Sequence, residues 1–194
     1  RGLAFLIVCE HPPPLTVGRQ GSRREIRLNP EDMRWRDWPL RWVNRGGGCM
    51  LHLPGQLALY AVVPLDVLRL SVEGYLRQLG LAIGDLLADF SVAASLREPA
   101  DGVWVGQRMA AALGVSVRDW VTSFGAVINV DPNLDLFRHV AVSPGDSAPM
   151  TSLVRERGGP VRPALVRERL IEHLRDRLGF ARVALFTDHP ALHA

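Results

Sequence analysis

The most informative stretch of the chain is RGGGCMLHLPGQ, residues 45–56. Three glycines after a predicted strand at 40–44 let a ligand or another backbone approach closely, and their N–H groups can surround an anion or a carbonyl oxygen. Arg45 adds a fixed positive charge, and His52 can move a proton. The same letters also fit a flexible glycine turn followed by a surface histidine. The stretch is not a Walker A loop, because no Lys-Ser/Thr pair follows the glycines.

The thiol of Cys49 lies inside this stretch, which suggests a nucleophile close to His52. Residues three apart on a strand point to opposite faces, however, so we expect Cys49 to be a small buried core residue. The chain has two cysteines in total, Cys9 and Cys49. Two are too few for a disulfide framework or for a zinc site, and we expect no metal.

All 23 basic residues of the 194 are arginine, so the chain contains no lysine at all. Any mechanism that needs a lysine nucleophile, Schiff base or general acid is therefore excluded. With 20 acidic residues the net charge is +3, which is too small to indicate nucleic acid and is compatible with an acidic protein partner. No apolar run approaches the roughly 20 residues that span a bilayer. We expect no membrane segment, no signal peptide and a cytoplasmic protein.

Hydrophobic patterning predicts one α/β (α+β) domain over residues 1–194, with a mixed sheet flanked by helices. Ser71 is the expected N-cap of the first main helix, and Gly179 the expected C-cap of a C-terminal helix at about 163–178. Residues 108–113 either continue a strand or turn. Residues 3–9 are predicted to form a strand buried on both faces. We expect strands at 3–9, 15–18, 40–44, 57–63, 103–105, 115–121, 126–130 and 183–186. We expect the first main helix within 67–90. Residues 19–39 are expected to form a loop with at most one short helix, and residues 131–149 a second loop.

An arginine- and tryptophan-rich segment, Arg34-Trp35-Arg36-Asp37-Trp38 with Arg41-Trp42, allows two interpretations. Interleaved cations and aromatic rings can neutralise phosphates and stack bases. The interpretation we favour is a loop that packs its tryptophans on the domain and leaves its arginines in solvent. His173, His189 and His193 are scattered near the C-terminus and are expected at the surface.

Read together, several segments resemble the lipoyl/octanoyl transferase family (lipoate–protein ligase B). Residues 10–19 resemble its Glu-His-Pro-Pro-x-x-Thr-x-Gly-Arg element, and residues 45–56 its Arg-Gly-Gly-x-x-x-x-His-Gly-Pro-Gly-Gln signature. Residues 121–137 resemble Thr-x-His-Gly-x-Ala-Leu-Asn-Val-x-x-Asp-Leu-x-x-Phe. The blocks Gly102–Val105, Leu113–Val115 and Thr151–Leu153 also match. Order and spacing hold almost without gaps from about residue 10 to residue 153.

The resemblance implies the fold of the biotin and lipoate ligase catalytic domain. It implies transfer of an octanoyl group from acyl carrier protein to a lipoyl-domain lysine, through a thioester on an enzyme cysteine assisted by an enzyme lysine. It implies no cofactor, and its partners are acyl carrier protein and the lipoyl domain. The glycine loop and its histidine are expected to line the acyl pocket. The expected substrate-binding residues are Arg45, Gly46, Gly47, Gly48, Gly55, Gln56, Phe124 and Gly125.

The departures from the family pattern fall on the chemistry. Counting from Phe137 and back from Thr151 places Ser143 where the family has its cysteine. Counting from Gly114 places Met109 where the family has its lysine, with Arg108 beside it. Phe124 stands at the position of a family histidine, and Leu53 at that of a family glycine.

Serine is a poorer nucleophile than a thiol at neutral pH, and methionine cannot exchange a proton. The favoured hypothesis is therefore a degenerate member, or pseudoenzyme, that binds an acyl or lipoyl group, an acyl carrier protein or a lipoyl domain as an accessory protein. The alternative is an active acyltransferase with a changed mechanism that uses Ser143 and His52. Nucleic-acid binding through the Arg/Trp segment is a weaker hypothesis. An ATP-dependent ligase is the weakest, because those relatives also use a lysine.

Overall fold

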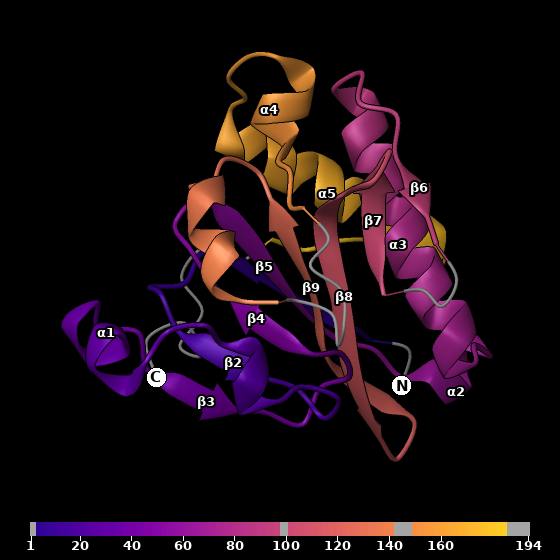
Figure 1. Cartoon of the computed structure of the whole chain (residues 1–194). Coiled ribbons are helices and arrows are strands. Elements are labelled where there is room, and N and C mark those ends of the chain that lie inside the picture. Colours follow the sequence, from indigo (N-terminus) through magenta and orange to yellow (C-terminus); the bar gives the residue numbers. More distant parts are fainter. Residues whose placement is uncertain (1–2, 98–100, 142–148, 186–194) are drawn as a thin grey trace.

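The computed structural model describes residues 3–97, 101–141 and 149–185, which form two sheets and flanking helices (Figure 1). The large sheet has the strand order β1-β5-β9-β8-β7-β6, and the small sheet the order β3-β2-β4. The strands are β1 (Phe5–Cys9), β2 (Leu15–Val17), β3 (Leu40–Trp42), β4 (Cys49–Leu51), β5 (Gln56–Val62), β6 (Ser95–Leu96), β7 (Gly102–Val105), β8 (Arg108–Arg118) and β9 (Val121–Asn129). The helices are η1 (Arg23–Glu25), α1 (Pro30–Trp35), α2 (Leu65–Leu68), α3 (Val72–Asp89), η2 (Leu134–His139), α4 (Leu153–Arg157) and α5 (Pro163–Leu178). The two sheets and their flanking helices confirm the predicted fold class. The large sheet is antiparallel throughout, and the mixed pairing is in the small sheet, where β2 runs parallel to β3 and antiparallel to β4.

Helix α3 begins, and helix α5 ends, at the capping residue that the sequence predicts. The Ser71 side chain accepts a hydrogen bond from the backbone N–H of Gly74 at 3.0 Å and caps α3. Gly179 follows α5 with φ +74°, in the left-handed conformation that glycine adopts without strain. Helices α3 and α5 pack together on one face of the large sheet, where they bury the main apolar core. The small sheet and α1 lie on the other side (Figure 1).

The long strands β8 and β9 form a hairpin, which corrects the prediction of one strand at 115–121. Arg118 pairs with Val121, and Asp119 and Trp120 between them have φ of +50° and +61°. Positive φ at both central residues is the signature of the tight turn whose twist matches a hairpin. Without the usual Asn-Gly pair, the sequence did not reveal this turn. Residues 108–113 continue β8 rather than turning.

Strand β1 corrects a second expectation, because it lies at the edge of the large sheet and is not buried on both faces. It pairs only with β5 within the sheet, and Leu3 and Phe5 are 72% and 64% exposed. Residues 182–185 are not in a strand, which removes the described part of the predicted strand at 183–186; Phe186 lies outside the described residues. The predicted loops at 19–39 and 131–149 contain the short helices η1, α1 and η2.

Candidate functional site

The guanidinium of Arg45 is the polar centre of the glycine loop. It is 5% exposed and donates hydrogen bonds to the carbonyl oxygens of Gly46 at 3.0 Å and Gly48 at 3.1 Å. It also donates to Thr16 on β2, to the hydroxyl at 2.9 Å and the carbonyl at 3.3 Å. Burial lowers the pKa of Arg45, although an arginine stays charged near neutral pH. The arginine therefore holds the loop closed on itself and does not project into solvent.

The loop rests directly on the hairpin strand β8, because glycine replaces a side chain at the contact. The N–H of Gly46 donates to the Val115 carbonyl at 2.8 Å. A Cβ on Gly114 would lie 2.8 Å from the Gly46 carbonyl oxygen, closer than real Cβ contacts. Gly47 has φ +81°, which an L side chain would adopt only with strain. The loop joins β3 to β4 of the small sheet and packs in a defined conformation on β8 of the large sheet, so it is not the flexible turn considered from sequence.

His52 is a buried histidine, which excludes the surface position considered from sequence. It is 7% exposed, and its Nε2 lies 3.2 Å from the Thr16 hydroxyl oxygen. Burial, with the charges of neighbouring His11 and Arg45, lowers the pKa of His52 to about 4. His52 is therefore neutral at pH 7. Since Arg45 donates to the same hydroxyl, Thr16 is free to donate its own proton to His52.

A cavity of about 170 Å³ opens beside His52, between the small sheet and one face of the large sheet. Its polar wall combines His52, Arg45 and Thr16 with two residues that the sequence analysis did not select, His11 and Tyr60. His11 Nε2 lies 2.7 Å from the Tyr60 hydroxyl, and the His11 and His52 rings meet edge to face at 5.5 Å. The apolar wall is made mostly of small residues from the large sheet: Ala58, Ala112, Gly114, Gly125, Ala126 and Val127.

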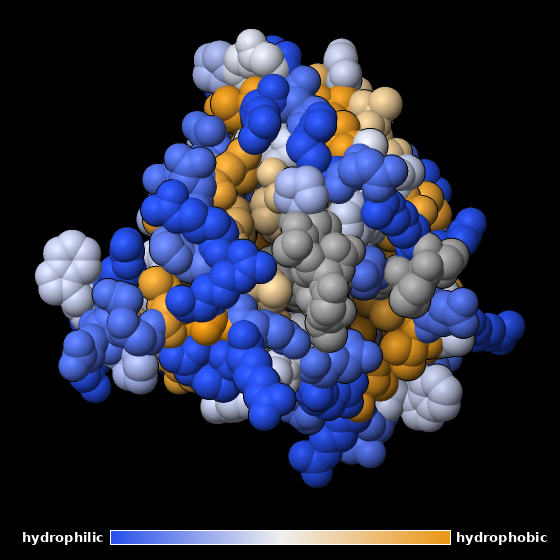
Figure 2. Space-filling model, in the orientation of Figure 1, coloured by the Kyte–Doolittle hydropathy of each residue, from blue (hydrophilic) through white to orange (hydrophobic). Residues whose placement is uncertain are grey.

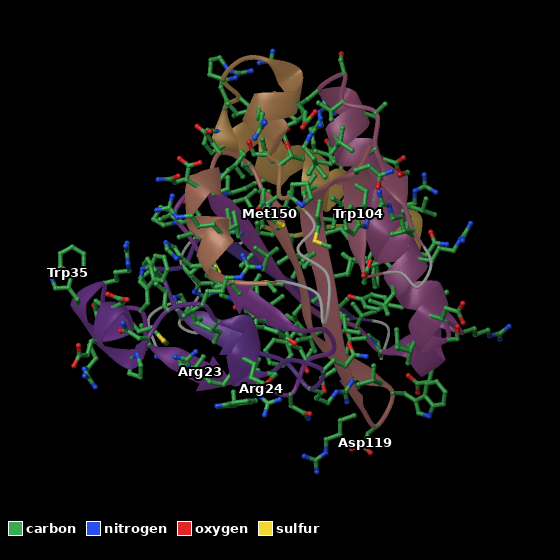
Figure 3. The ribbon with its side chains drawn as sticks, viewed as in Figure 1. Arg23, Arg24, Trp35, Trp104, Asp119 and Met150 are labelled. Atoms are coloured by element: carbon green, nitrogen blue, oxygen red, sulfur yellow. The ribbon has the colours of Figure 1, made fainter. Side chains whose placement is uncertain are left out.

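Met109, at the family lysine position, is a core residue next to this cavity. It is 2% exposed and packs in an apolar cluster with Met50, Ala58, Trp104, Ala112 and Val127. Met150 packs against the same cluster, and the N–H of Thr151 donates to the Met109 carbonyl at 2.9 Å. Figure 3 shows Met150 and Trp104 over the large sheet. The position predicted to correspond to the family lysine therefore holds an apolar side chain in apolar surroundings. The neighbouring Arg108 instead donates to Glu156 at 2.8 Å and ties β8 to α4.

Phe124, at a family histidine position, lines the cavity in a strained backbone conformation. Its φ is +63°, which is uncommon for a bulky residue, and its ring lies 6.3 Å from that of Tyr60. Gly125 beside it faces β5 so closely that a Cβ would lie 2.5 Å from the Leu59 carbonyl oxygen. Strained residues of this kind cluster at functional sites, where packing holds them in place.

The remaining predicted residues hold the frame and do not line this cavity. Gly55 turns the chain with φ +86°, and Gln56 accepts from the Leu53 N–H at 2.6 Å and donates to Asn129 at 2.8 Å. Cys49 is buried as expected: its thiol donates to the Ser22 carbonyl, and burial raises its pKa to about 11. Ser143 lies outside the described residues, so its relation to His52 stays a prediction.

The tryptophan segment only partly follows the favoured interpretation. Trp38 is buried at 6% exposure, but Trp35 and Trp42 are 84% and 64% exposed. Trp35 projects away from the rest of the molecule (Figure 3), and the Arg36 guanidinium lies 5.8 Å and 5.4 Å from the rings of Trp35 and Trp38. The face of the molecule that carries this segment is mostly hydrophilic, with apolar residues showing between charged ones (Figure 2).

Neither a metal site nor a membrane helix is found in the described part of the chain. No group of three or more His, Cys, Asp or Glu side chains there is placed to hold a metal ion. No helix in residues 3–97, 101–141 or 149–185 has the length and apolarity to cross a bilayer. His173 Nε2 donates to the Asp89 carboxylate at 2.8 Å near the surface, while His189 and His193 lie outside the described residues.

The model of the lipoyl protein ligase A/B catalytic domain matches residues 2–175, and the chain belongs to that family. It is 33% identical over 176 residues to an octanoyltransferase of Cytophaga hutchinsonii, covering 88% of this chain and 72% of the relative. It is 37% identical over 150 residues to an octanoyltransferase of Gloeobacter violaceus, covering 77% and 65%. The chain thus spans about two thirds to three quarters of these relatives.

Solved structures confirm the fold at much lower identity. A bipartite lipoate protein ligase of Thermoplasma acidophilum superposes with a TM-score of 0.76 at 17% identity, covering 95% of this chain and 75% of that one. Lipoate-protein ligase A bound with ATP gives 0.77 at 16%, covering 95% and 77%. Biotin protein ligase of Aquifex aeolicus gives 0.53 at 13%, covering 84% and 68%.

The lowered pKa of His52 predicts how stability depends on pH. The unfolded chain binds a proton on this histidine near pH 6.5, whereas the folded chain does so only near pH 4. The neutral buried ring therefore makes its full contribution to the free energy of unfolding above pH 6.5, and this contribution is lost as the pH falls toward 4. We expect the His52 ring protons in an NMR titration to shift near pH 4. A midpoint near 6.5 would contradict the buried environment.

Proposed function

We propose that this protein binds an octanoyl or lipoyl group, presented by an acyl carrier protein or a lipoyl domain, as an accessory member of its family. We further propose that it works in the cytoplasm as one domain over residues 1–194. The observation that carries the proposal is that Met109 packs in an apolar cluster next to the cavity that His52 lines. In the family pattern that position holds a lysine, and the whole chain has none. In this proposal the residues that would bind the acyl group are kept, whereas methionine replaces the lysine that would transfer a proton.

The composition of the cavity supports an acyl ligand. Its floor is built from Ala58, Ala112, Gly114, Gly125 and Val127, whose short side chains leave room for an apolar chain along the sheet. Polar groups gather on one wall only, at Arg45, His52, His11 and Tyr60. Ligand sites of this kind use apolar surface for affinity and a few polar groups for orientation. An acyl chain with one polar carbonyl end matches both features.

The second candidate is an active acyltransferase that uses Ser143 and His52. One observation favours it: His52 lines the cavity and is neutral at pH 7, the protonation state that a general base requires. Against it, Met109 supplies no second proton-transferring group. The exposed Trp35 and Trp42 add no comparable site for nucleic acid.

Filling the cavity tests the binding proposal. Ala112→Leu adds three carbons to a side chain on the cavity floor, so we expect octanoyl-acyl carrier protein to bind at least tenfold more weakly in a calorimetric titration. The matched control is Ala88→Leu, at an exposed position on α3 across the sheet. Equal affinities for the wild type and both variants would contradict an acyl ligand in this cavity. No measurable binding by the wild type would do the same.

Turnover separates the two candidates. With octanoyl-acyl carrier protein and a lipoyl domain as substrates, we expect no enzyme-dependent transfer of the octanoyl group to the lipoyl-domain lysine, measured by the mass of the lipoyl domain. Sustained transfer that is abolished by Ser143→Ala and by His52→Gln would establish the serine mechanism and overturn the accessory role. Transfer of the octanoyl group that survives Ser143→Ala would overturn both the accessory role and the serine mechanism.

A further inference from the structure

The second cysteine of the chain, Cys9, lies on the cavity face of the large sheet. It is the last residue of β1 and pairs directly with Ala58 of β5. Residues directly opposite each other on paired strands project to the same face, and Ala58 lines the cavity. Cys9 packs against the apolar cluster that contains Met109 and Ala112. Strands β5 and β9 lie between β1 and β8, so Cys9 is three strand spacings, roughly 14 Å, from the strand that carries Met109.

The thiol of Cys9 faces an imidazole. Its sulfur lies 3.6 Å from His11 Nε2, and the same nitrogen lies 2.7 Å from the Tyr60 hydroxyl oxygen. His11 and Tyr60 both line the cavity, whose wall also contains two polar side chains more than nine-tenths buried, Arg45 and His52. The base, His11, stands in the cavity wall, and the thiol lies next to it on the same face of the sheet, outside the lining itself. A nucleophile and a base within hydrogen-bonding reach form the minimal arrangement for covalent acyl capture.

We propose that Cys9 accepts the acyl group from a carrier thioester, with His11 as its general base. This inference rests on the proposed function, because it requires the acyl chain to enter the cavity. It assigns the covalent step to β1, at the edge of the large sheet and three strands away from β8, which carries Met109. Neither Ser143 nor Met109 takes part in it.

The step is a transthioesterification and balances without any redox partner. His11 Nε2 takes the thiol proton while the Cys9 sulfur attacks the carbonyl carbon of the acyl thioester. The new carbon–sulfur bond to Cys9 forms, the bond to the carrier sulfur breaks, and the carrier thiolate leaves with the proton returned by His11. The products are acyl-Cys9 and a free carrier thiol. While His11 holds the proton, the Tyr60 oxygen can accept a hydrogen bond from its Nε2.

The electrostatics agree with a neutral thiol–imidazole pair that transfers its proton only during attack. Burial raises the pKa of Cys9, which Arg167 opposes and Glu10 reinforces. Burial also lowers the pKa of His11, and the charge of Arg41 lowers it further. His11 is therefore unprotonated at pH 7 and able to act as a base, as the imidazole does for a serine nucleophile.

Cys49 provides an internal comparison. Its thiol donates to the Ser22 carbonyl in the core between the small sheet and α1, and its pKa is raised to about 11. Its strand neighbour Met50 faces the cavity instead. Cys49 is therefore unreactive for a structural reason, and the two cysteines of one chain are predicted to behave differently.

The test is incubation of the full chain with octanoyl-pantetheine, followed by intact-protein mass measurement and tryptic mapping. We expect one adduct with the mass of one octanoyl group, released by hydroxylamine at neutral pH as a thioester is. Cleavage after arginine separates the candidates, since Cys9 lies in peptide 2–19, Cys49 in 46–69 and Ser143 in 139–155. The wild-type map therefore locates the adduct even if a variant fails to fold.

Variants supply the matched controls. We expect Cys9→Ala to lose the adduct, and Cys49→Ala and Ser143→Ala to keep it. His11→Asn is expected to slow adduct formation at least tenfold, because positioned general bases typically contribute 10²–10⁴-fold. An unchanged rate in His11→Asn would overturn the base assignment.

An adduct on Cys49 or Ser143 would overturn the assignment of Cys9. Binding of octanoyl-acyl carrier protein without any adduct would overturn the covalent step and leave the proposed function intact. Absence of both binding and adduct would overturn the two together.

Discussion

One buried cation holds the cavity together. Arg45 carries its charge at 5% exposure, where an unpaired charge would cost several kcal/mol. Its hydrogen bonds to Gly46, Gly48 and Thr16 satisfy it. Those bonds close the glycine loop, join it to the small sheet and fix the hydroxyl that faces His52. The loop in turn docks on β8 only because Gly114 leaves room for its backbone. The cavity between the sheets therefore depends on this one guanidinium and its acceptors.

In the function that we propose, the site combines a retained frame with an altered chemical centre. Arg45, Gly47, Gly55 and Gln56 make the contacts that shape the loop and the adjoining turn. Met109 and Phe124 replace family polar groups by apolar ones, and neither can transfer a proton. A frame that still forms a cavity, next to a centre without the usual proton donor, is what an acyl-binding or acyl-holding protein requires. The His11–Cys9 pair is a different polar centre on the same cavity.

The sequence predicted the parts of the fold that depend on local pattern. Helical periodicity predicted the apolar face of α3. Capping chemistry predicted its start after Ser71 and the end of α5 before Gly179. The edge position of β1 was missed because an apolar run looks the same whether one or both faces are covered. The Asp119–Trp120 turn was missed because tryptophan stands where such turns usually have glycine, and a bulky residue seldom adopts positive φ.

Cavity residues were predicted only where they fell inside a recognisable motif. His52 and Arg45 stood in the glycine stretch, and the structure places both in the wall. His11 stood in the quoted Glu-His-Pro-Pro element but its role needed the pairing of β1 with β5, which brings Tyr60 within 2.7 Å. Such cross-strand proximity is a tertiary property. Gly55 and Gln56 do not line this cavity, and their expected part in substrate binding stays a prediction.

The central claim is that an acyl chain occupies the space between the small sheet and the alanine- and glycine-lined floor. The most direct measurement is a set of nuclear Overhauser contacts between a ¹³C-labelled octanoyl chain on acyl carrier protein and assigned methyl groups of this protein. We expect contacts to the methyls of Ala58, Ala112 and Val127. Contacts confined to residues outside the cavity, such as the exposed Val67, would contradict the claim.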